Sequence, residues 1–424
     1  MAIVRKEKFI FVETNENHNK VWYIEEHDNN SIRTEWGRVG NNMAESTKSF
    51  SDQYTTSKEY DKLVKSKLKK GYTKLKTIDS ADSVAKIGLE SIALNDISYD
   101  KNSSLITNMI KDFCKSNIHN IVSNTNISFN ADSNIFTTPV GVVTLEAVEE
   151  ARILLKDISN FVEKKDFDNI DFTKSVEKYC SLIPQKISKK FNPKEIFSNL
   201  DKVNNQGDVL NSLTDSIKTI NELNKNPQNR EKIFNTSLKL VEDQKTIDYI
   251  THLFKSTHNN MHSCRNLKIK NIYEISIDVM NKHYEETESE WKVKGKDLNH
   301  MTLWHGTKKH NIISIMKNGL VIPPKNASYT TGAMFGVGLY FSDQSTKSLN
   351  YSYGYWDGTR DSNCYMFLAD VLMGKAYIPS RASGYKPDGY DSIFAKAHKS
   401  GVMNNEMIVM PCQAKLKYLI EFGN

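Results

Sequence analysis

The pattern of hydrophobic and polar positions changes twice along the 424 residues of the chain. Near the N-terminus, short apolar runs at 9–12, 21–24 and 32–39 alternate with polar turns, a pattern that predicts β-strands. A helix is expected from about Ser57, and its stop is expected at Gly71. One face of this helix would carry Tyr60, Leu63, Val64 and Leu68. The first segment is therefore predicted to be small, β-rich and basic.

From about residue 85 to 255 the apolar positions recur every three or four residues, and the periodic runs contain almost no Gly or Pro. The clearest run extends from Leu145 to Val162, and Thr144 before it is a good N-cap residue. The same period appears at 105–113 and 209–220, whereas 124–134 and 224–230 read as polar loops. The segment is predicted to be a bundle of several helices.

After about residue 258 the chain is β-rich again, and Gly, Pro and aromatic residues crowd between Trp304 and Tyr355. Binding and catalytic residues concentrate in such loop-rich regions, so we expect the chemistry here. The fold class is multidomain α+β. It consists of a small β-rich domain at 1–82, an all-α bundle at 85–255 and a mixed α/β domain with antiparallel sheets at 258–424.

Composition adds little to this picture. The chain has 57 Lys and Arg against 51 Asp and Glu, a net charge of +6, which is compatible with a polyanionic partner but does not establish one. Its five scattered cysteines form no C-x-x-C pair, which argues against a zinc ribbon and a disulfide framework and fits a reducing compartment. No apolar run approaches the ~18 residues that span a bilayer, and the N-terminus has no signal-peptide pattern. We expect no membrane partner.

Two motifs have weak signals when taken alone. Trp36 and Arg38 lie two apart on a predicted strand and share a face that could stack on a base and bind a phosphate. A Trp-Gly-Arg tripeptide is nevertheless more often an ordinary piece of strand. His258, His262 and Cys264 have a spacing that zinc could use, but a fourth nearby ligand is missing, so a plain loop is preferred.

The stronger constellation lies between residues 303 and 406. The Gly-rich stretch 332–341 is not a dinucleotide fingerprint, because its last glycine runs into a strand-like segment instead of opening a helix. A strand-like run at 303–307 ends in a His and a Gly, and further candidates follow along the chain: His305, Gly306, Tyr340, Ser348, Tyr351 and Glu406. Such residues suit a planar aromatic amide joined to a ribose, although spacing alone does not show that they converge.

Together these residues resemble the DNA-dependent poly(ADP-ribose) polymerases over nearly the whole chain. Residues 19–23 and 34–40 are similar to the family's WGR domain, and 138–141 and 179–184 to its helical regulatory domain. The motifs at 303–307, 336–341, 346–351 and 405–406 are similar to its ADP-ribosyltransferase domain. The chain looks most like the short members of the family, which carry a WGR domain but no zinc fingers or BRCT module.

The resemblance implies NAD+ as a substrate, no metal, and a triad of His305, Tyr340 and Glu406 in which Glu406 is the catalytic residue. His305 would orient the 2′-hydroxyl of the nicotinamide ribose, Gly306 and Ser348 would hold the carboxamide, and Tyr340 and Tyr351 would pack on the ring. The full set implied to bind NAD+ is His305, Gly306, Thr307, Asn311, Tyr340, Ser348 and Tyr351.

The resemblance also implies partners on either side of the donor site. Lys347 and Met334 would line the acceptor side, and Trp36 and Arg38 would contact DNA. The implied donor loop is about 323–332. The implied acceptor-side loop is about 381–401, and its composition is typical of a mobile segment. Three positions depart from residues common in the family and bear on NAD+ affinity and chain length: Val321, Ala333 and Val337.

The implied function is NAD-dependent poly-ADP-ribosylation of proteins, the chain itself included, activated by DNA strand breaks in the DNA damage response. An accessory factor that completes the active site is a further implied partner. Two alternatives stay open: a mono-ADP-ribosyltransferase of protein or DNA ends, and a DNA-end-binding scaffold with weak catalysis. The location would be nuclear in a eukaryote and cytoplasmic otherwise.

Overall fold

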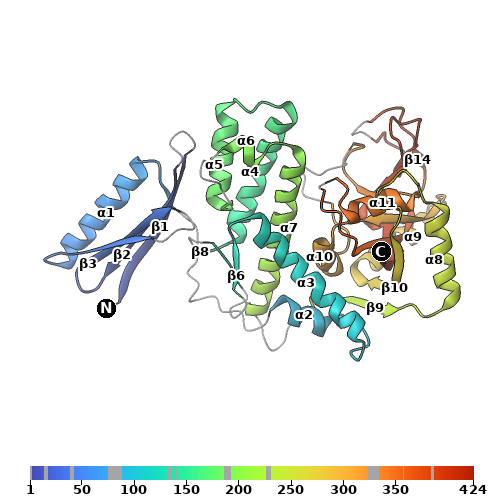
Figure 1. The fold of residues 1–424 in the computed structure, drawn as a ribbon, viewed down its shortest axis with the longest axis horizontal. Helices are drawn as coiled ribbons and strands as arrows, with labels where there is room; N and C mark the ends of the chain where they lie inside the picture. The colour runs from blue at the N-terminus through green and yellow to red at the C-terminus, as the bar shows by residue number, and fades with distance from the viewer. Residues whose placement is uncertain are drawn as a thin grey trace. The chain divides into compact units, whose positions relative to one another are not determined.

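The computed structural model in Figure 1 describes residues 2–13, 18–38, 43–74, 88–130, 135–138, 141–185, 192–225, 231–322, 334–356, 358–382 and 386–424. These residues form two compact units. The first contains described residues from 2–88 and 120–225, and the second those from 89–119, 231–322 and 334–424. No helix in these described ranges is long and apolar enough to cross a membrane.

The first unit begins with an antiparallel sheet of five strands in the order β4-β3-β2-β1-β5. Its strands are β1 (Ile3–Glu13), β2 (His18–His27), β3 (Ser31–Arg38), β4 (Ala44–Ser49) and β5 (Thr73–Lys74), and helix α1 (Gln53–Lys69) lies across it. Tyr60 of α1 packs against Phe9, Trp22, Ile24 and Ile32. The strands predicted from the apolar runs are confirmed: β1 and β2 extend beyond the runs at 9–12 and 21–24, and β3 covers the run at 32–39 as far as Arg38.

Helix α1 shows how local sequence sets its ends. It begins after Asp52, whose carboxylate accepts a hydrogen bond from the Thr55 backbone N–H at 2.7 Å. The predicted start at Ser57 was therefore wrong by about one turn, because the N-terminal turn is polar and lies outside the apolar period. The predicted stop is confirmed, since Gly71 has φ +84°, a conformation that favours glycine.

The rest of the first unit is mainly helical. Its helices are α4 (Leu145–Lys164), α5 (Ile170–Leu182), α6 (Pro193–Ile196), α7 (Leu200–Lys225) and the end of α3 (Ser104–Asn124). Short strands β6 (Ser128–Asn130), β7 (Ile135–Thr138) and β8 (Gly141–Val142) form a three-stranded sheet. The expected loop at 124–134 is corrected at Ser128–Asn130, which pair with β7. The loop expected at 224–230 is corrected at 224–225, which belong to α7. Residues 131–134 and 226–230 lie outside the described residues.

The second unit contains two sheets. The larger has the order β11-β13-β17-β10-β9 and is antiparallel, and the smaller has the order β12-β16-β15-β14. Their strands are β9 (Thr236–Leu240), β10 (Lys268–Ile277), β11 (His300–Gly306), β12 (Leu339–Phe341), β13 (Cys364–Leu372), β14 (Ala376–Tyr377), β15 (Ser392–Ala395), β16 (Glu406–Val409) and β17 (Ala414–Gly423). The predicted fold class, α+β with a mixed domain built on antiparallel sheets, is confirmed.

Helices surround these two sheets. They are α2 (Leu89–Asp96), the first part of α3, α8 (Gln244–Ser256), α9 (Asp278–Val293), α10 (Lys309–Asn318) and α11 (Ser345–Tyr353), and a 3₁₀ turn covers Pro411–Gln413. Helix α8 packs Phe254 against Trp304 and Phe422 of the larger sheet. Helix α11 buries Leu349 in the same apolar cluster, so both helices are anchored to one sheet.

Residues 89–119 pack with the C-terminal part of the chain, although their period groups them with the helical segment. The Phe113 ring meets Tyr365 edge-on at 4.8 Å between centroids. The Asn117 side chain donates to the His310 carbonyl at 2.9 Å, at the start of α10. Within the second unit, α3 is therefore hydrogen-bonded to the start of α10. The predicted domain bounds 1–82, 85–255 and 258–424 stay predictions.

The N-cap of α4 is confirmed, since the Thr144 hydroxyl accepts from the Ala147 N–H at 3.2 Å. We expect Thr144→Ala to speed amide hydrogen exchange in the first turns of α4 about fivefold, because losing such a cap costs about 1 kcal/mol. Thr144→Ser keeps the hydroxyl and is the matched control, with exchange close to wild type. Equal exchange rates in wild type and Thr144→Ala would contradict this role.

Candidate active site

The site is built on a close approach between strand β11 and helix α11. A Cβ atom added to Gly306 would lie 1.7 Å from the Ser348 carbonyl oxygen, so only glycine fits there. The Ser348 hydroxyl donates to the carbonyl of Trp304, two residues before Gly306, at 3.0 Å. The two elements therefore lie in backbone contact, and a larger residue would force them apart.

His305 precedes this glycine, and its partner fixes its tautomer. Its Nδ1 lies 2.9 Å from the Tyr340 carbonyl oxygen. A carbonyl only accepts, so Nδ1 carries the proton and Nε2 presents a lone pair. Burial is the main cause that lowers the pKa of His305, and the Lys347 ammonium lowers it further. The neutral ring thus offers a hydrogen-bond acceptor at neutral pH.

Tyr340 ties the glycine-rich segment to the site. Its hydroxyl donates to the Gly336 carbonyl at 2.7 Å and accepts from the Phe335 N–H at 3.1 Å. Burial raises the pKa of Tyr340 well above its ordinary value, so the phenol stays protonated. Burial, with the Glu406 carboxylate, raises the pKa of Tyr351 to about 12. Both rings remain neutral and can pack on a planar ligand.

Lys347 and Glu406 form a buried ion pair with Nζ 2.6 Å from Oε1, and their side chains are only 11% and 10% exposed. The other carboxylate oxygen, Oε2, is buried and has no hydrogen-bond partner among the described residues. Burial is the main cause that lowers the pKa of Lys347, and Glu406 opposes this shift. An unpartnered buried carboxylate oxygen is costly and marks a position where a ligand hydroxyl can donate.

Glu406 owes its position to the residue before it. The Asn405 carbonyl accepts from the Ser342 hydroxyl at 2.7 Å, its Oδ1 accepts from the Ala397 N–H at 2.8 Å, and its Nδ2 donates to Asp343 at 2.8 Å. Neither Ser342 nor Asp343 belongs to a motif that points to this role. Their position directly after strand β12 was the only sequence signal.

The loop with His258, His262 and Cys264 fastens helix α11. His262 Nδ1 and the Asn259 N–H both lie 2.8 Å from the Thr346 hydroxyl, and the Cys264 thiol donates to the Thr346 carbonyl at 3.3 Å. Thr346 directly precedes Lys347. His258 is engaged as well, with its ring nitrogens 3.2 Å from Asn260 Oδ1 and 2.9 Å from the Arg265 carbonyl oxygen. Across the described ranges, no three His, Cys, Asp or Glu side chains gather in a way that could hold a metal ion.

The remaining predicted residues lie around this network. Thr307 N–H donates to Ser352 at 3.1 Å, and Asn311 on α10 donates to the Thr307 hydroxyl at 3.3 Å. The Lys347 ammonium lies 5.7 Å from the centre of the Tyr351 ring. Met334 is half exposed, and Val321 and Val337 are exposed. Ala333, the donor loop 323–332 and residues 383–385 of the acceptor-side loop lie outside the described residues.

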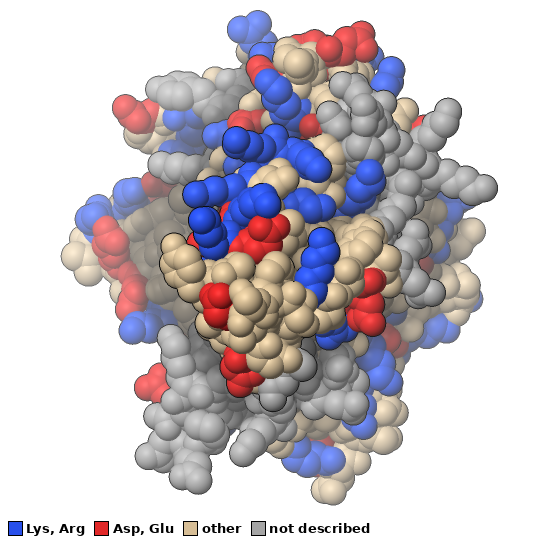
Figure 2. Space-filling model, turned by 90° about the vertical axis from the view of Figure 1, so that its left-hand side faces the viewer, with Lys and Arg blue, Asp and Glu red and all other residues tan. Residues whose placement is uncertain are grey.

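The N-terminal sheet carries the predicted nucleic-acid residues. Trp36 and Arg38 both lie on β3, and Trp36 is opposite Trp22 of β2. Trp36 is 41% exposed, which is high for a tryptophan. Arg38 is opposite Lys20, and nothing further of its side chain is described. Figure 2 shows the face of the molecule on which Lys and Arg side chains gather.

Three domain families match the chain. The WGR domain matches residues 7–78, the poly(ADP-ribose) polymerase regulatory domain matches 103–257, and the poly(ADP-ribose) polymerase catalytic domain matches 244–423. The three matches follow one another along the chain with a short overlap at 244–257. Every residue of the network around Gly306 falls within the third match.

Similar proteins include Poly [ADP-ribose] polymerase 1 of Gallus gallus, 28% identical over 256 residues, with 58% of this chain and 24% of that protein covered. Poly [ADP-ribose] polymerase 2 of Homo sapiens is 28% identical over 208 residues, with 41% of this chain and 33% of that protein covered. Poly [ADP-ribose] polymerase 2 of Arabidopsis thaliana is 23% identical over 256 residues. The matched stretch thus spans about a quarter to two fifths of the curated relatives.

The contact between β11 and α11 predicts a large effect of Gly306→Ala. The added methyl group must displace the Ser348 carbonyl, so we expect the melting temperature of the full chain to fall more than in Ser348→Ala. The latter variant loses one hydrogen bond, worth about 1 kcal/mol. Differential scanning calorimetry of both variants measures this. Equal shifts would show that the approach of the two backbones is not constraining.

Proposed function

Because this chain belongs to the poly(ADP-ribose) polymerase family, we propose that it transfers the ADP-ribose group of NAD+ to protein acceptors. The observation that carries the proposal is the network in which a neutral His305 and the unpartnered oxygen of Glu406 flank the Gly306–Ser348 contact. NAD+ is the substrate, and the chemistry needs no metal.

The donor-side roles follow those that the family resemblance implies, and the geometry of this network is compatible with them. His305 Nε2 accepts a hydrogen bond from the 2′-hydroxyl of the nicotinamide ribose. The Gly306 backbone and the Ser348 hydroxyl hold the carboxamide. The Ser348 proton is already given to Trp304, so its oxygen lone pairs accept from the amide N–H. Tyr340 and Tyr351 pack on the ring, and Thr307 and Asn311 line the neighbouring part of the donor.

Transfer breaks the bond between C1′ and the nicotinamide nitrogen, and the bonding electrons leave with neutral nicotinamide. Positive charge develops at C1′, where the negative Glu406 carboxylate stabilises it. The acceptor hydroxyl forms the new bond to C1′, and its proton passes to Glu406 Oε2 and then to solvent. Lys347 pairs with the other carboxylate oxygen, Oε1, and is assigned with Met334 to the acceptor side.

Glu406 supports elongation into a polymer. Each new acceptor in elongation is a ribose hydroxyl, which Glu406 Oε2 can polarise. A mono-ADP-ribosyltransferase would use the same donor network and stop after one unit. Val321 and Val337 are exposed and outside the hydrogen-bonded network, so their departure from common family residues leaves that network intact. This observation favours an active enzyme over a scaffold with weak catalysis.

Regulation by DNA is the second part of the proposal. The N-terminal sheet binds DNA strand breaks through the exposed Trp36 and through Arg38, and binding loosens the helical segment that restrains access of NAD+. The chain itself and other proteins are acceptors, and an accessory factor that completes the active site fits the same scheme. The enzyme then acts in the DNA damage response, in the nucleus if the source is eukaryotic.

Removing the charge of the catalytic carboxylate tests its role. We expect Glu406→Gln to lower the rate of chain elongation at saturating NAD+ by about 10²-fold or more, because polarisation of the acceptor hydroxyl is lost. Radiolabelled NAD+ and polymer length on a sequencing gel measure this rate. Glu285→Gln, on the exposed surface of α9, is the matched control. Elongation at the wild-type rate in Glu406→Gln would refute the assignment.

The contact of α3 with α10 predicts a change in basal activity. Asn117→Ala removes the hydrogen bond to the His310 carbonyl, next to Asn311. We expect DNA-independent activity to rise about fivefold, as loss of about 1 kcal/mol of restraint allows, with the DNA-stimulated maximum unchanged. Lys115→Ala, an exposed change on the same helix, is the control. An unchanged DNA-free rate in Asn117→Ala would argue against restraint by α3.

A further inference from the structure

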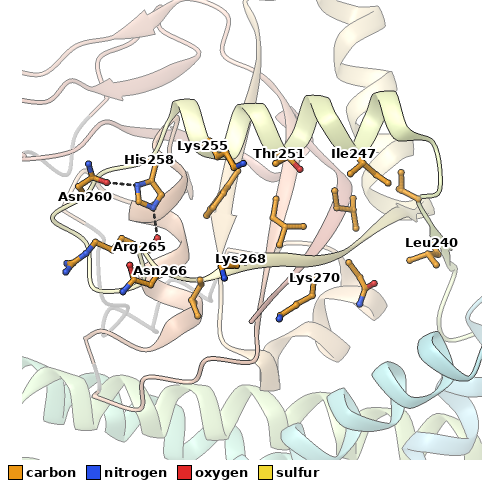
Figure 3. Close-up of a pocket in the computed structure, with 16 residues that line it drawn as sticks. Leu240, Ile247, Thr251, Lys255, His258, Asn260, Arg265, Asn266, Lys268 and Lys270 are labelled. Carbon is orange, nitrogen blue, oxygen red and sulfur yellow. Dashed lines mark hydrogen bonds between the residues drawn. The ribbon is translucent and has the colours of Figure 1, made fainter. Parts of the chain in front are cut away.

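One cavity of the second unit lies outside the network around Gly306. It is a groove of about 1050 Å³ between helix α8 and strand β10, and Figure 3 shows the two elements along its sides. Its apolar lining includes four partly exposed aliphatic side chains: Leu240, Val241, Ile247 and Ile269. Neither Glu406 nor His305 lines it, so the proposed transfer chemistry does not use it.

The groove exposes an unpaired strand edge. Strand β10 pairs with β17 along residues 268–274, but with β9 only from Tyr273 onward. The Val241 N–H continues that pairing by donating to the Ile272 carbonyl at 2.9 Å, and there it ends within the described chain. Among the residues that the structure describes, 268–271 thus have a strand neighbour on one side only. An open edge of this kind is a template for an added strand.

The charge of the groove has one sign. Lys255, Arg265, Lys268 and Lys270 line it, and no Asp or Glu does. Lys270 contacts the Asn424 carbonyl, whereas Lys255, Arg265 and Lys268 are exposed and make no ion pair within the described residues. Figure 3 shows these cations distributed along the groove, from the end of α8 to β10. The groove therefore favours a ligand with several negative charges.

We propose that this groove binds an extended acidic peptide segment of a partner protein, which adds as a strand to the open edge of β10. Alternate aliphatic side chains of the peptide rest on Val241, Ile247 and Ile269, and its carboxylates face Lys255, Arg265 and Lys268. Helix α8, with 13 residues, is about 20 Å long, which matches an extended segment of about six residues.

The lining favours a peptide over a nucleic acid strand. Single strands are held by stacking of bases on exposed aromatic rings. Two aromatic rings line the groove. Phe254 is only 5% exposed and packs against Trp304 and Phe422, and the His258 ring is fixed by hydrogen bonds at both nitrogens, to Asn260 and to the Arg265 carbonyl. An unpaired strand edge instead supplies backbone N–H and C=O groups in the spacing of a polypeptide.

The probe is a fluorescein-labelled peptide of alternating Glu and Val, eight residues long, titrated with the full chain and followed by fluorescence anisotropy at low salt. We expect saturable binding and at least a tenfold weaker affinity for the double variant Arg265→Glu, Lys268→Glu. Lys282→Glu, an exposed reversal on α9, is the control and should bind as wild type does. Circular dichroism checks that each variant is folded.

A second peptide, N-methylated at alternate residues, tests strand addition directly. It keeps the charges and side chains but loses N–H donors, so we expect its affinity to fall at least tenfold. No saturable binding of the first peptide would overturn the proposal, as would equal affinity for the methylated peptide or equal competition by an oligo(dT) strand of the same charge. These readouts require no transferase activity and stay independent of the proposed enzymatic function.

Discussion

The contact between the backbone of Gly306 and that of Ser348 is the constraint on which the candidate site depends. It brings the end of β11 against α11, and this single approach fixes His305 on one element and Lys347 on the other. Hydrogen bonds of Asn259 and His262 with Thr346 attach the loop at 258–264 to α11. Lys347 can then reach Glu406 of the smaller sheet, so one steric fact links both sheets of the second unit.

The electrostatics follow from the same packing. Burial keeps His305 neutral and leaves its Nε2 as an acceptor, while the buried Lys347–Glu406 pair retains a carboxylate oxygen with no partner among the described residues. Taking two charges out of water can cost more than their mutual attraction returns, and the buried oxygen without a hydrogen-bond donor adds to this cost. That arrangement suits a site in which a hydroxyl and a developing positive charge supply the missing interactions.

Local patterns in the sequence predicted local structure well. Apolar runs predicted the N-terminal strands, and the period behind Thr144 predicted α4 with its cap. The motif residues His305, Tyr340, Ser348 and Glu406 could be chosen because each belongs to a short recognisable pattern. Contacts between distant segments could not be predicted, because no period encodes them. Examples are the hydrogen bond between His262 and Thr346, the contacts of Asn405 with Ser342 and Asp343, and the packing of 89–119.

We propose that the network around Gly306 performs ADP-ribosyl transfer under the control of DNA breaks. The most direct measurement is incorporation of labelled NAD+ by the purified chain, with and without a nicked duplex, resolved on a denaturing gel. We expect a smear of modified protein that intensifies with the nicked duplex. Absence of label while the chain still binds the duplex would contradict it, and a single sharp band would contradict the polymer product.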